Sequence, residues 1–308
     1  MHKMNVLYTF DNKFWRMAAV SINSLLKNCA NGANVCVYCM VAPRTRGYKK
    51  IKKIVTEYGG TLIWKQIRKS QNPFRNHEFL RWSPVIFYRL FVHRIFPELD
   101  KVLYLDSDTL VRSDLKKLYE TDISEYSFGA VCDLAPVKVT ESVSGQYVKK
   151  FIQEYLKHDL YVNSGVLLIN VKEVAKYENE MLSAEITLKY PDQDIINYVF
   201  DGKILRLPLK YNFVPNVENY TNLISDGEFV DAVKNTEIFH FYAIKPYVYS
   251  VLSRDFYEMF AIAAQEIGFY PEDFITKQKK QKKYQKTMIP GLYLGKNNSL
   301  RFLGIRLV

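Results

Sequence analysis

The stretch Lys101-Val-Leu-Tyr-Leu-Asp-Ser-Asp-Thr-Leu-Val-Arg112 indicates the fold class of this chain. Its apolar residues 102–105 run directly into Asp106-Ser107-Asp108. A short continuous apolar run is typical of a strand buried on both faces, as in the parallel part of an α/β sheet. The carboxyl ends of such strands form the ligand-binding edge of open α/β folds. We therefore expect an α/β protein whose functional site lies where residues 106–108 leave the sheet.

The acidic pair within this stretch is a candidate metal site. If the extended backbone continues through the triplet, Asp106 and Asp108 project to the same side. Two converging carboxylates suit a hard divalent cation, which prefers oxygen ligands and can also hold phosphate oxygens. A simple turn with a helix cap is the alternative, because acidic residues after a strand often serve only that purpose. Asp192-Gln-Asp194 repeats the spacing, so the spacing alone does not decide.

The flanking sequence predicts an alternation of strands and helices. Strands are expected at 4–10, 35–41, 61–64, 128–132 and 161–170, and helices at 15–31, 44–58, 84–95, 171–189 and from 191 onward. This alternation favours a doubly wound sheet with helices on both faces. A chain of 308 residues can form one large α/β domain with an appendage. We expect a domain over 1–265 and a separate segment over 266–308.

Composition and cysteine usage suggest a protein of the cytoplasm. The chain is 48% hydrophobic and 24% charged, as is ordinary for a globular protein. Its start runs directly into a strand without a signal-peptide core, and no apolar run approaches the roughly 20 residues of a membrane span. The four cysteines form no disulfide framework at this length. Cys36 and Cys39 have C-x-x-C spacing within an expected strand, where they face opposite sides, so we expect them to be buried free thiols that share no metal.

The net charge of +11 is concentrated at the end of the chain. Residues 277–308 contain nine Lys and Arg and no Asp or Glu, which leaves 34 basic against 32 acidic residues in 1–276. The basic run 277–286 is followed by aromatic and aliphatic residues, a composition that suits a segment lying on an anionic membrane. A solvated chain end is the alternative. The near-neutral body argues against a nucleic-acid-binding protein.

Six short motifs occur in an order and spacing that together resemble one family. They are Tyr8-Thr-Phe-Asp-Asn12, Tyr88-Arg89-Leu90, Val102-Leu-Tyr-Leu-Asp-Ser-Asp108, Asn163-Ser-Gly165, Asp192-Gln-Asp194, and His240 with Lys245-Pro-Tyr247. Each motif is weak alone. Over residues 4–250 the chain resembles glycosyltransferase family 8, which includes glycogenin and bacterial lipopolysaccharide galactosyl- and glucosyltransferases.

The resemblance implies a GT-A fold, in which a Rossmann-like mixed sheet is flanked by helices, here with a basic amphipathic C-terminal tail. It implies transfer of glucose or galactose from UDP-glucose or UDP-galactose, with retention of configuration. The acceptor would be a lipid-linked, lipopolysaccharide or glycoprotein glycan. The cofactor would be Mn²⁺, with Mg²⁺ as the alternative, since oxygen ligands and one imidazole suit Mn²⁺ at least as well.

The resemblance also assigns candidate roles to residues. Asp106, Asp108 and His240 would be the metal ligands. Gln193 and Asp192 would be the catalytic pair. The donor would contact Thr9, Asp11, Asn12, Arg89, Asp106, Ser107, Asn163, Ser164, Asp192 and Lys245. Within that set, Asp11 and Asn12 would meet the uridine, while Arg89, Asn163 and Asp192 would hold sugar hydroxyls.

The chemistry expected at this site leaves two mechanisms open. A bound cation, assisted by Lys245, would stabilise the departing diphosphate. Gln193 would lie beneath the anomeric carbon, but an amide is a poor nucleophile, so a front-face reaction and a covalent intermediate remain alternatives. The loop before Lys245 is one residue shorter than the family pattern, and Tyr247 replaces the usual Trp. The position of Lys245 over the diphosphate is therefore open.

A sugar-nucleotide pyrophosphorylase is the competing enzyme class. It would need a Gly- and Arg-rich phosphate loop after the first strand, and Phe10-Asp-Asn-Lys-Phe14 contains none. We therefore expect a glycosyltransferase working in the cytoplasm at the inner face of the plasma membrane.

Overall fold

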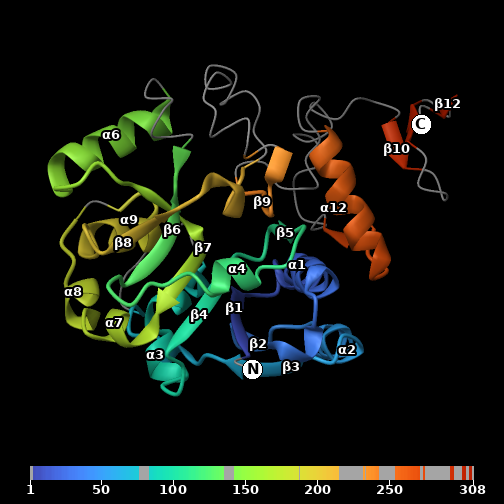
Figure 1. Cartoon of the computed structure of the whole chain (residues 1–308), viewed down its shortest axis with the longest axis horizontal. Helices are drawn as coiled ribbons and strands as arrows, with labels where there is room; N and C mark the ends of the chain where they lie inside the picture. Colours follow the sequence, from blue (N-terminus) through green and yellow to red (C-terminus); the bar gives the residue numbers. More distant parts are fainter. Residues whose placement is uncertain are drawn as a thin grey trace.

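The computed structural model describes most of the chain before residue 275 and three short strands beyond it. The described residues are 3–75, 83–134, 142–186, 188–214, 232, 234–242, 254–270, 273–274, 292–294, 300–302 and 305–306. Their centre is a seven-stranded sheet of order β3-β2-β1-β4-β7-β6-β8 with helices on both faces (Figure 1). The mixed, helix-flanked sheet expected from the sequence is confirmed.

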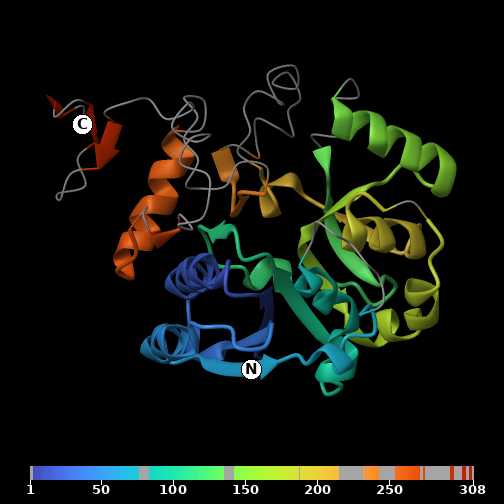
Figure 2. The same cartoon turned by 180° about the vertical axis from the view of Figure 1, so that it is seen from behind.

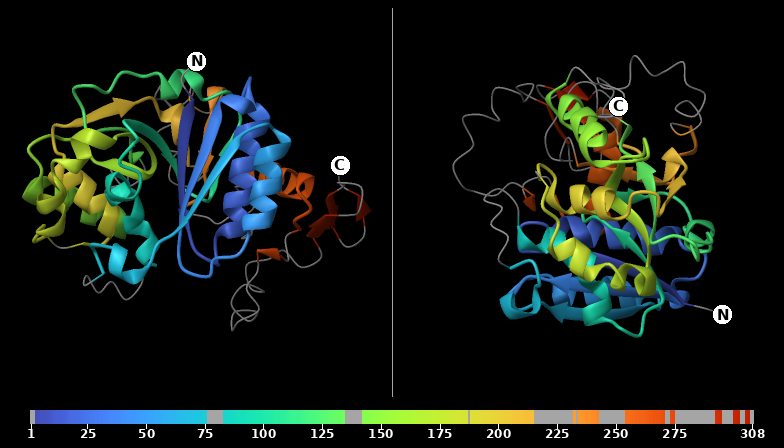
Figure 3. Two further views of the ribbon diagram at one scale, coloured as in Figure 1. Left: turned by 90° about the horizontal axis from the view of Figure 1, so that it is seen from below. Right: turned by 90° about the vertical axis from the view of Figure 1, so that its left-hand side faces the viewer.

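The first half of the sheet is parallel. Strands β1 (Met4–Phe10), β2 (Val35–Val41), β3 (Thr61–Gln66) and β4 (Lys101–Leu105) pair in parallel, in the order β3-β2-β1-β4. Parallel strands need crossover connections, and the helices α1 (Trp15–Asn28) and α2 (Tyr48–Glu57) supply two of them. The left view of Figure 3 shows α1 and α2 side by side against these strands. The carboxyl ends of the four strands therefore meet at one edge.

The second half of the sheet brings other segments to the same edge. Strand β7 (Val162–Asn170) pairs antiparallel with both β4 and β6 (Phe128–Cys132), and β8 (Ile204–Leu207) pairs parallel with β6. The amino end of β7 and the carboxyl end of β6 consequently lie beside the end of β4. Polar residues at these three ends become neighbours although they are far apart in the sequence.

Two apolar cores fill the two faces of the sheet. On β1, Val6, Tyr8 and Phe10 belong to the core beneath α1 and α2, whereas Leu7 belongs to the opposite core. Alternate residues of a strand face opposite sides, so a strand that is buried throughout must be apolar throughout. The first core extends to α12 (Arg254–Glu266), which lies next to α1 in both front and back views (Figure 2).

A two-stranded ribbon, β5 (Thr109–Val111) with β9 (Ile238–His240), stands beside the main sheet. It begins directly after the acidic triplet, and Phe213 forms an isolated bridge to Phe239 on its other side. This ribbon ties the middle of the chain to residues about 130 positions later. It is the element through which the late part of the sequence reaches the edge of the sheet.

Several expected helices have different bounds or geometry. The expected helix 84–95 is a 3₁₀ helix, η3 (Pro84–Phe91), continued by α3 (Val92–Ile95). The expected helix 171–189 is wrong, because two short helices, α7 (Val171–Ala175) and α8 (Glu178–Leu182), replace it. Breaks of a single turn are set by tertiary packing, so they cannot be predicted from the spacing of apolar residues.

The remaining elements are short or lie at the periphery. They are η1 (Gly32–Asn34), η2 (Lys69–Gln71), α4 (Lys116–Tyr119), α6 (Val143–Tyr155), α9 (Pro191–Val199), η4 (Leu209–Tyr211), and an antiparallel sheet of β10 (Leu292–Leu294), β11 (Leu300–Phe302) and β12 (Ile305–Arg306). The basic run 277–286 lies outside the described residues. In the part of the chain that is described, no helix combines the length and apolar character that a bilayer crossing requires.

The four cysteines are free thiols, as expected. Cys36 and Cys39 are buried in β2, but Cys29 and Cys132 are only half-buried. The expected burial of Cys36 and Cys39 is therefore confirmed, and the two half-buried thiols lie at the ends of elements, where packing is less complete.

Candidate active site

The acidic pair follows β4 as a turn and does not continue the strand. The Thr109 amide donates to the Asp106 carbonyl at 3.3 Å, and the Asp106 amide donates to the Gly165 carbonyl of β7 at 2.8 Å. The condition of an extended backbone through the triplet is therefore not met, and the alternative of a turn holds. The two carboxylates nevertheless converge, because the tight turn directs both of them toward the same imidazole, that of His240.

His240 reaches this point through the register of β5 and β9. Thr109 is paired with His240, and the Phe241 amide donates to the Asp108 carbonyl at 2.9 Å. His240 Nε2 lies 3.5 Å from Asp106 Oδ2 and 3.4 Å from Asp108 Oδ1. The candidate ligand atoms of the three residues all lie within 4.8 Å of one another. The backbone pairing of two strands thus assembles a cluster that the sequence separates by more than 130 residues.

The imidazole of His240 is held by a hydrogen-bond relay on its other side. His240 Nδ1 lies 2.9 Å from Asn212 Oδ1, and Asn212 Nδ2 donates to Asn163 Oδ1 at 2.8 Å. An amide oxygen can only accept, so Nδ1 carries the proton in this contact. Nε2 is buried and has no hydrogen-bond partner among the described residues. This is the usual arrangement of a metal-binding histidine, whose second nitrogen is fixed by an outer partner.

Glycine at position 165 makes room for this imidazole. A Cβ built on Gly165 would lie 2.0 Å from His240 Cε1, a distance that no real side chain shows. Gly165 also supplies the carbonyl that anchors Asp106. The glycine of the Asn163-Ser-Gly165 motif is therefore required by close approach of a strand to the histidine ring.

Charges within the cluster favour the ionised carboxylates. Burial alone would raise the pKa of Asp106, but Arg89 and His240 outweigh burial and lower that pKa. Burial alone would lower the pKa of His240, but the adjacent Asp106 and Asp108 raise it to about 9. The two carboxylates thus favour a positive charge at the position between them and His240.

The two oxygens of Asp106 have different partners. Oδ1 accepts a hydrogen bond from the Tyr104 hydroxyl at 2.5 Å and lies 3.0 Å from the Arg89 guanidinium. Oδ2 faces His240. Arg89 also stacks over the Tyr104 ring, 4.2 Å from its centroid. Tyr104 and Arg89 together fix the rotation of the Asp106 carboxylate and leave one oxygen directed into the cluster.

These residues fit a divalent cation. They offer one imidazole nitrogen that has no hydrogen-bond partner among the described residues, and two carboxylates, at separations that one ion can bridge. Carboxylate and imidazole ligands in combination suit first-row divalent ions and Mg²⁺. A candidate metal site of Asp106, Asp108 and His240 is accordingly present.

A second polar cluster adjoins this site at the start of β7 and of α9. Ser164 Oγ donates to Asp192 Oδ2 at 2.9 Å, and the Arg89 guanidinium donates to the Ser164 carbonyl at 2.6 Å. Arg89 also lies 3.4 Å from Asp192 Oδ2. The buried Arg89 therefore bridges the two clusters, and Asp106 and Asp192 lie on its two sides.

The amide of Gln193 is fixed in one orientation. Its Nε2 donates to Asp133 Oδ2 at 3.0 Å, and its Oε1 accepts from the Ser164 amide at 3.1 Å and from Asn163 Nδ2 at 3.2 Å. Asp133 also accepts from the Tyr242 hydroxyl at 3.0 Å. Burial raises the pKa of Asp133. Gln193 is therefore a buried part of a polar network that lines the same edge.

The other acidic residue on α9, Asp194, faces away from this network. Its oxygens accept from Tyr161 at 2.5 Å, Tyr147 at 2.8 Å, and the backbone amides of Lys189 and Tyr190 at 2.8 and 2.7 Å. Asp194 is fully buried. The two carboxylates of Asp192-Gln-Asp194 therefore lie in different places. Asp192 lies at the polar edge, and Asp194 holds the start of α9 against Tyr147 and Tyr161.

The remaining candidate donor residues lie at different distances from the cluster. Thr9 Oγ1 is 3.1 Å from the Tyr104 hydroxyl, and Ser107 Oγ is 3.4 Å from the Thr9 carbonyl, so both are buried beside Asp106. Asp11 and Asn12 organise loops at the end of β1: Asp11 accepts from Ser83 and Lys13, and Asn12 bonds to the loop after β2. Lys245 lies outside the described residues.

Three residues that surround the site were not expected from the sequence. Asp133 follows β6, and a polar residue directly after a buried strand was the signal used for Asp106. Tyr104 resembles any apolar residue of a buried strand, and Asn212 lies in a segment without a clear pattern. Asp133 could therefore have been found from the sequence, whereas Tyr104 and Asn212 needed the tertiary contacts.

The comparisons with known proteins identify the family. The model of the glycosyl transferase family 8 matches residues 5–249. A lipopolysaccharide 1,2-glucosyltransferase of Escherichia coli is 30% identical over 242 residues, covering 72% of this chain and 68% of that protein. A putative glycosyltransferase of Haemophilus influenzae is 28% identical over 220 residues, covering 69% of this chain and 64% of that protein. The chain belongs to glycosyl transferase family 8.

Solved structures confirm the fold. The galactosyltransferase LgtC, solved with donor and acceptor sugar analogs, superposes with a TM-score of 0.70 at 24% identity and covers 88% of this chain and 99% of LgtC. The bifunctional glycosyltransferase WbbM superposes with a TM-score of 0.73 at 22% identity, covering 86% of this chain and 51% of WbbM. The expected GT-A fold and the expected enzyme class, a hexosyltransferase, are confirmed.

Proposed function

We propose that this enzyme transfers glucose or galactose from UDP-glucose or UDP-galactose to a glycan hydroxyl, with retention of anomeric configuration and with Mn²⁺ as the preferred cation. The observation that supports this most directly is the cluster of Asp106, Asp108 and His240, whose Nε2 faces both carboxylates, at the carboxyl edge of the sheet. That edge is where ligands bind in open α/β folds. The relatives' names add glucosyl and galactosyl transfer.

The cation, when bound by Asp106, Asp108 and His240, would neutralise the diphosphate and make it a better leaving group. The protein's own part is to hold these ligands ready. Tyr104 and Arg89 fix one carboxylate, and Asn212 fixes the imidazole. Rigid, pre-oriented ligands spare the reorganisation that the reaction would otherwise require.

The second cluster is the proposed seat of the transferred sugar. This cluster offers hydroxyl, amide and carboxylate groups from Asn163, Ser164, Asp192 and Gln193. It adjoins the metal site because Arg89 contacts Ser164 and Asp192 on one side and Asp106 on the other. Sugar hydroxyls both donate and accept, so a mixed set of this kind is suited to hold them. Thr9, Asp11, Asn12 and Ser107 at the ends of β1 and β4 are the proposed nucleotide contacts, and Lys245 is proposed for the diphosphate.

The mechanism that the contacts favour is a front-face reaction. The oxygen of Gln193 already accepts two hydrogen bonds, from the Ser164 amide and from Asn163, so it is poorly placed to attack carbon. Asp194 is fully buried behind two tyrosine hydroxyls. In a front-face reaction the leaving phosphate oxygen takes the proton of the incoming hydroxyl on the same side of the sugar.

The acceptor and the place of work are proposed from the relatives and from the tail. Two similar proteins act on lipopolysaccharide by name, which favours a lipid-linked or lipopolysaccharide glycan over a glycoprotein. We propose a catalytic domain over 1–265 and a membrane-associating segment over 266–308, acting in the cytoplasm at the inner face of the plasma membrane. The nine cations of residues 277–308 are the reason.

The test is release of UDP from a panel of UDP-sugars with Mn²⁺, with Mg²⁺, or with a chelator. The intact enzyme should release UDP with Mn²⁺ and one hexose donor, and NMR of the product should show the α-anomer. The variant with Asp106→Asn and Asp108→Asn should lose at least 100-fold in rate. The control, Asp122→Asn, changes an exposed loop carboxylate outside the site. An unchanged rate in the double variant, or equal rates with the chelator, would contradict the proposal.

A further inference from the structure

Charge is distributed very unevenly along the body of the chain. Residues 1–75 contain 14 Lys and Arg against two acidic residues, a net charge of +12. Residues 76–276 contain 20 basic against 30 acidic residues, a net charge of −10. The near-neutral total of the body therefore hides a strongly basic first quarter. A separation of this size creates a lasting potential over one side of the molecule.

Nine of these cations form one surface, called the basic face below. Its members are Arg44, Arg46, Lys49, Lys50, Lys52, Lys53, Lys65, Arg68 and Lys69. Eight of the nine are exposed and Lys50 is half-buried. Glu57, at the end of α2, is the one acidic residue between positions 43 and 69.

The fold explains why these cations gather. The loop after β2 holds Arg44 and Arg46, and the loop after β3 holds Arg68 and Lys69. Parallel neighbours end at the same edge, and the Arg44 amide donates to Gln66 Oε1 at 3.4 Å, which joins the loop after β2 to the end of β3. The helix α2 begins immediately after the loop that follows β2. Its residues Ile51, Ile54 and Val55 are turned into the core.

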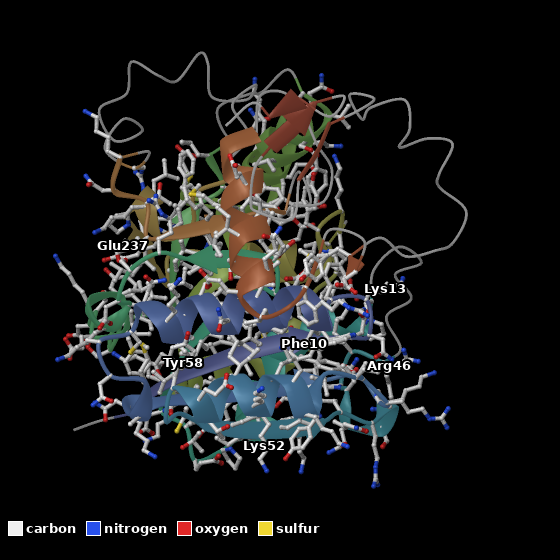
Figure 4. The ribbon with its side chains drawn as sticks, turned by 90° about the vertical axis from the view of Figure 1, so that its right-hand side faces the viewer. Phe10, Lys13, Arg46, Lys52, Tyr58 and Glu237 are labelled. Atoms are coloured by element: carbon white, nitrogen blue, oxygen red, sulfur yellow. The ribbon has the colours of Figure 1, made fainter. Side chains whose placement is uncertain are left out.

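The outer side of α2 completes the face. Lys49, Lys52 and Lys53 are exposed, and Tyr48 among them is 44% exposed. Figure 4 looks at this side of the molecule, with Lys52 extending from α2 and Arg46 from the loop at one end. Among the described residues, Lys53 has the one ion pair of the nine, to Glu57 at 3.7 Å, and both partners are largely exposed. Exposed pairs of this kind neutralise little.

The basic face adjoins the donor edge of the sheet. The Arg46 amide donates to Asn12 Oδ1 at 2.7 Å, and Asn12 Nδ2 donates to the Arg44 carbonyl at 3.1 Å. Asn12 follows β1 at the same edge as Asp106 follows β4. A partner bound to the basic face therefore comes to lie beside Asn12, one of the proposed nucleotide contacts.

From this arrangement we infer that the basic face is a docking surface for an anionic phospholipid bilayer, separate from residues 277–308. Its cations are spread over two loops and a helix, and the buried polar side chain among them, Thr45, is already bonded to the Ala42 carbonyl. This arrangement suits many headgroups in a plane better than one bound anion. The exposed Tyr48 adds a ring of the kind that favours the interfacial zone. Protection of an edge strand explains Lys65 on β3 but not the lysines of α2.

The experiment measures binding of the full chain to vesicles of phosphatidylcholine alone and of phosphatidylcholine with phosphatidylglycerol. The test variant changes Lys49, Lys52 and Lys53 to Gln. The control changes Lys117, Lys149 and Lys150 to Gln, three equally exposed lysines of the acidic part. Each set contains one member of an i,i+4 ion pair, Lys53 with Glu57 and Lys150 with Glu154. The net charge of the two variants is therefore the same.

The intact chain should bind the anionic vesicles and not the neutral ones, and should dissociate at high salt. Each lysine near the surface contributes about fivefold in affinity, so the test variant should bind the anionic vesicles about 100-fold more weakly than the intact chain. The affinity of the control variant should fall by less than about threefold. UDP release from a soluble donor should be the same in all three proteins, so a failure of the docking surface is distinguishable from a failure of the proposed transferase activity.

Three results would overturn the inference. Equal weakening in both variants would show a dependence on total charge alone. An unchanged affinity in the test variant would assign the binding to residues beyond 276. Tighter binding to a DNA duplex than to the vesicles, with loss in the test variant, would make the partner a nucleic acid.

Discussion

At the scale of single residues, the division of labour between the two oxygens of Asp106 is central to the site. Oδ1 is occupied by Tyr104 and Arg89, and Oδ2 is directed toward His240. Tyr104 is fully buried, and its hydroxyl also lies 3.1 Å from Thr9 Oγ1. Tyr104 is therefore a positioning residue, because it acts on a candidate ligand and offers no atom to the cation itself.

The variant Tyr104→Phe should retain the fold and weaken Mn²⁺ binding by about 10- to 100-fold, the usual effect of losing an outer-shell partner. Binding can be measured by the loss of the free Mn²⁺ signal in electron paramagnetic resonance, without any substrate. The control is Tyr119→Phe, which removes a hydroxyl bonded to the Lys101 carbonyl at the other end of β4. Equal affinities of Tyr104→Phe and the intact protein would show that Arg89 alone orients Asp106.

At the scale of elements, α9 has two faces with different tasks. Asp192 and Gln193 face the polar edge, whereas Asp194 accepts hydrogen bonds from Tyr147 of α6, from Tyr161 before β7, and from two backbone amides. The first turn of α9 is thus held in place by one carboxylate. Gln193 and Asp194 lie on the same turn of α9. The placement of Gln193 beside Asp133 therefore depends on the hydrogen bonds of Asp194.

Removing this carboxylate should cost stability. Asp194→Ala leaves two hydroxyls and the Tyr190 amide without their acceptor, while the Lys189 amide keeps the Tyr147 hydroxyl as its acceptor. The free energy of unfolding should fall by about 3 kcal/mol. Asp194→Asn keeps one acceptor oxygen and should cost less. Urea denaturation measures both. If Asp194 were the nucleophile, both variants would abolish transfer while leaving the unfolding midpoint unchanged, which would contradict the structural role.

At the scale of the whole molecule, the candidate metal site joins segments that lie far apart in the sequence. Asp106 and Asp108 come from the middle of the sheet, while His240 comes from β9 and is held by Asn212. A cation bound by all three would tie the ribbon of β5 and β9 to the end of β4. Binding to the folded state alone stabilises it by mass action.

Mn²⁺ should accordingly raise the melting temperature of the intact protein. At a free concentration 100 times its dissociation constant the gain is about 2.7 kcal/mol, or roughly 5 °C for a chain of this size. The variant with Asp106→Asn and Asp108→Asn should show no rise, although its own melting temperature without cation can differ. Differential scanning calorimetry with and without Mn²⁺ measures the shift. An equal rise in both proteins would place the binding elsewhere.

The fold class, the strands of the first half of the sheet and the acidic pair could all be predicted from the amino-acid pattern alone. Apolar runs such as 102–105 are long enough to specify buried strands, and the order of six motifs over residues 4–250 was specific enough to indicate the family that the comparisons confirm. The roles assigned to the individual site residues stay predictions. The breaks between α7 and α8 and the 3₁₀ geometry of η3 were not predictable, because packing sets them.

The surroundings of the acidic pair, in contrast, depend on contacts between distant segments. Strand pairing brings His240 opposite Thr109, the antiparallel β7 brings Asn163 and Gly165 to the end of β4, and Tyr104 turns out to hold a carboxylate. The clustering of the basic face likewise follows from parallel neighbours ending at one edge. The cause is the same in each case. Periodicity within a short stretch shows which side of a strand or helix is buried, but it does not show which distant segment will pack beside it.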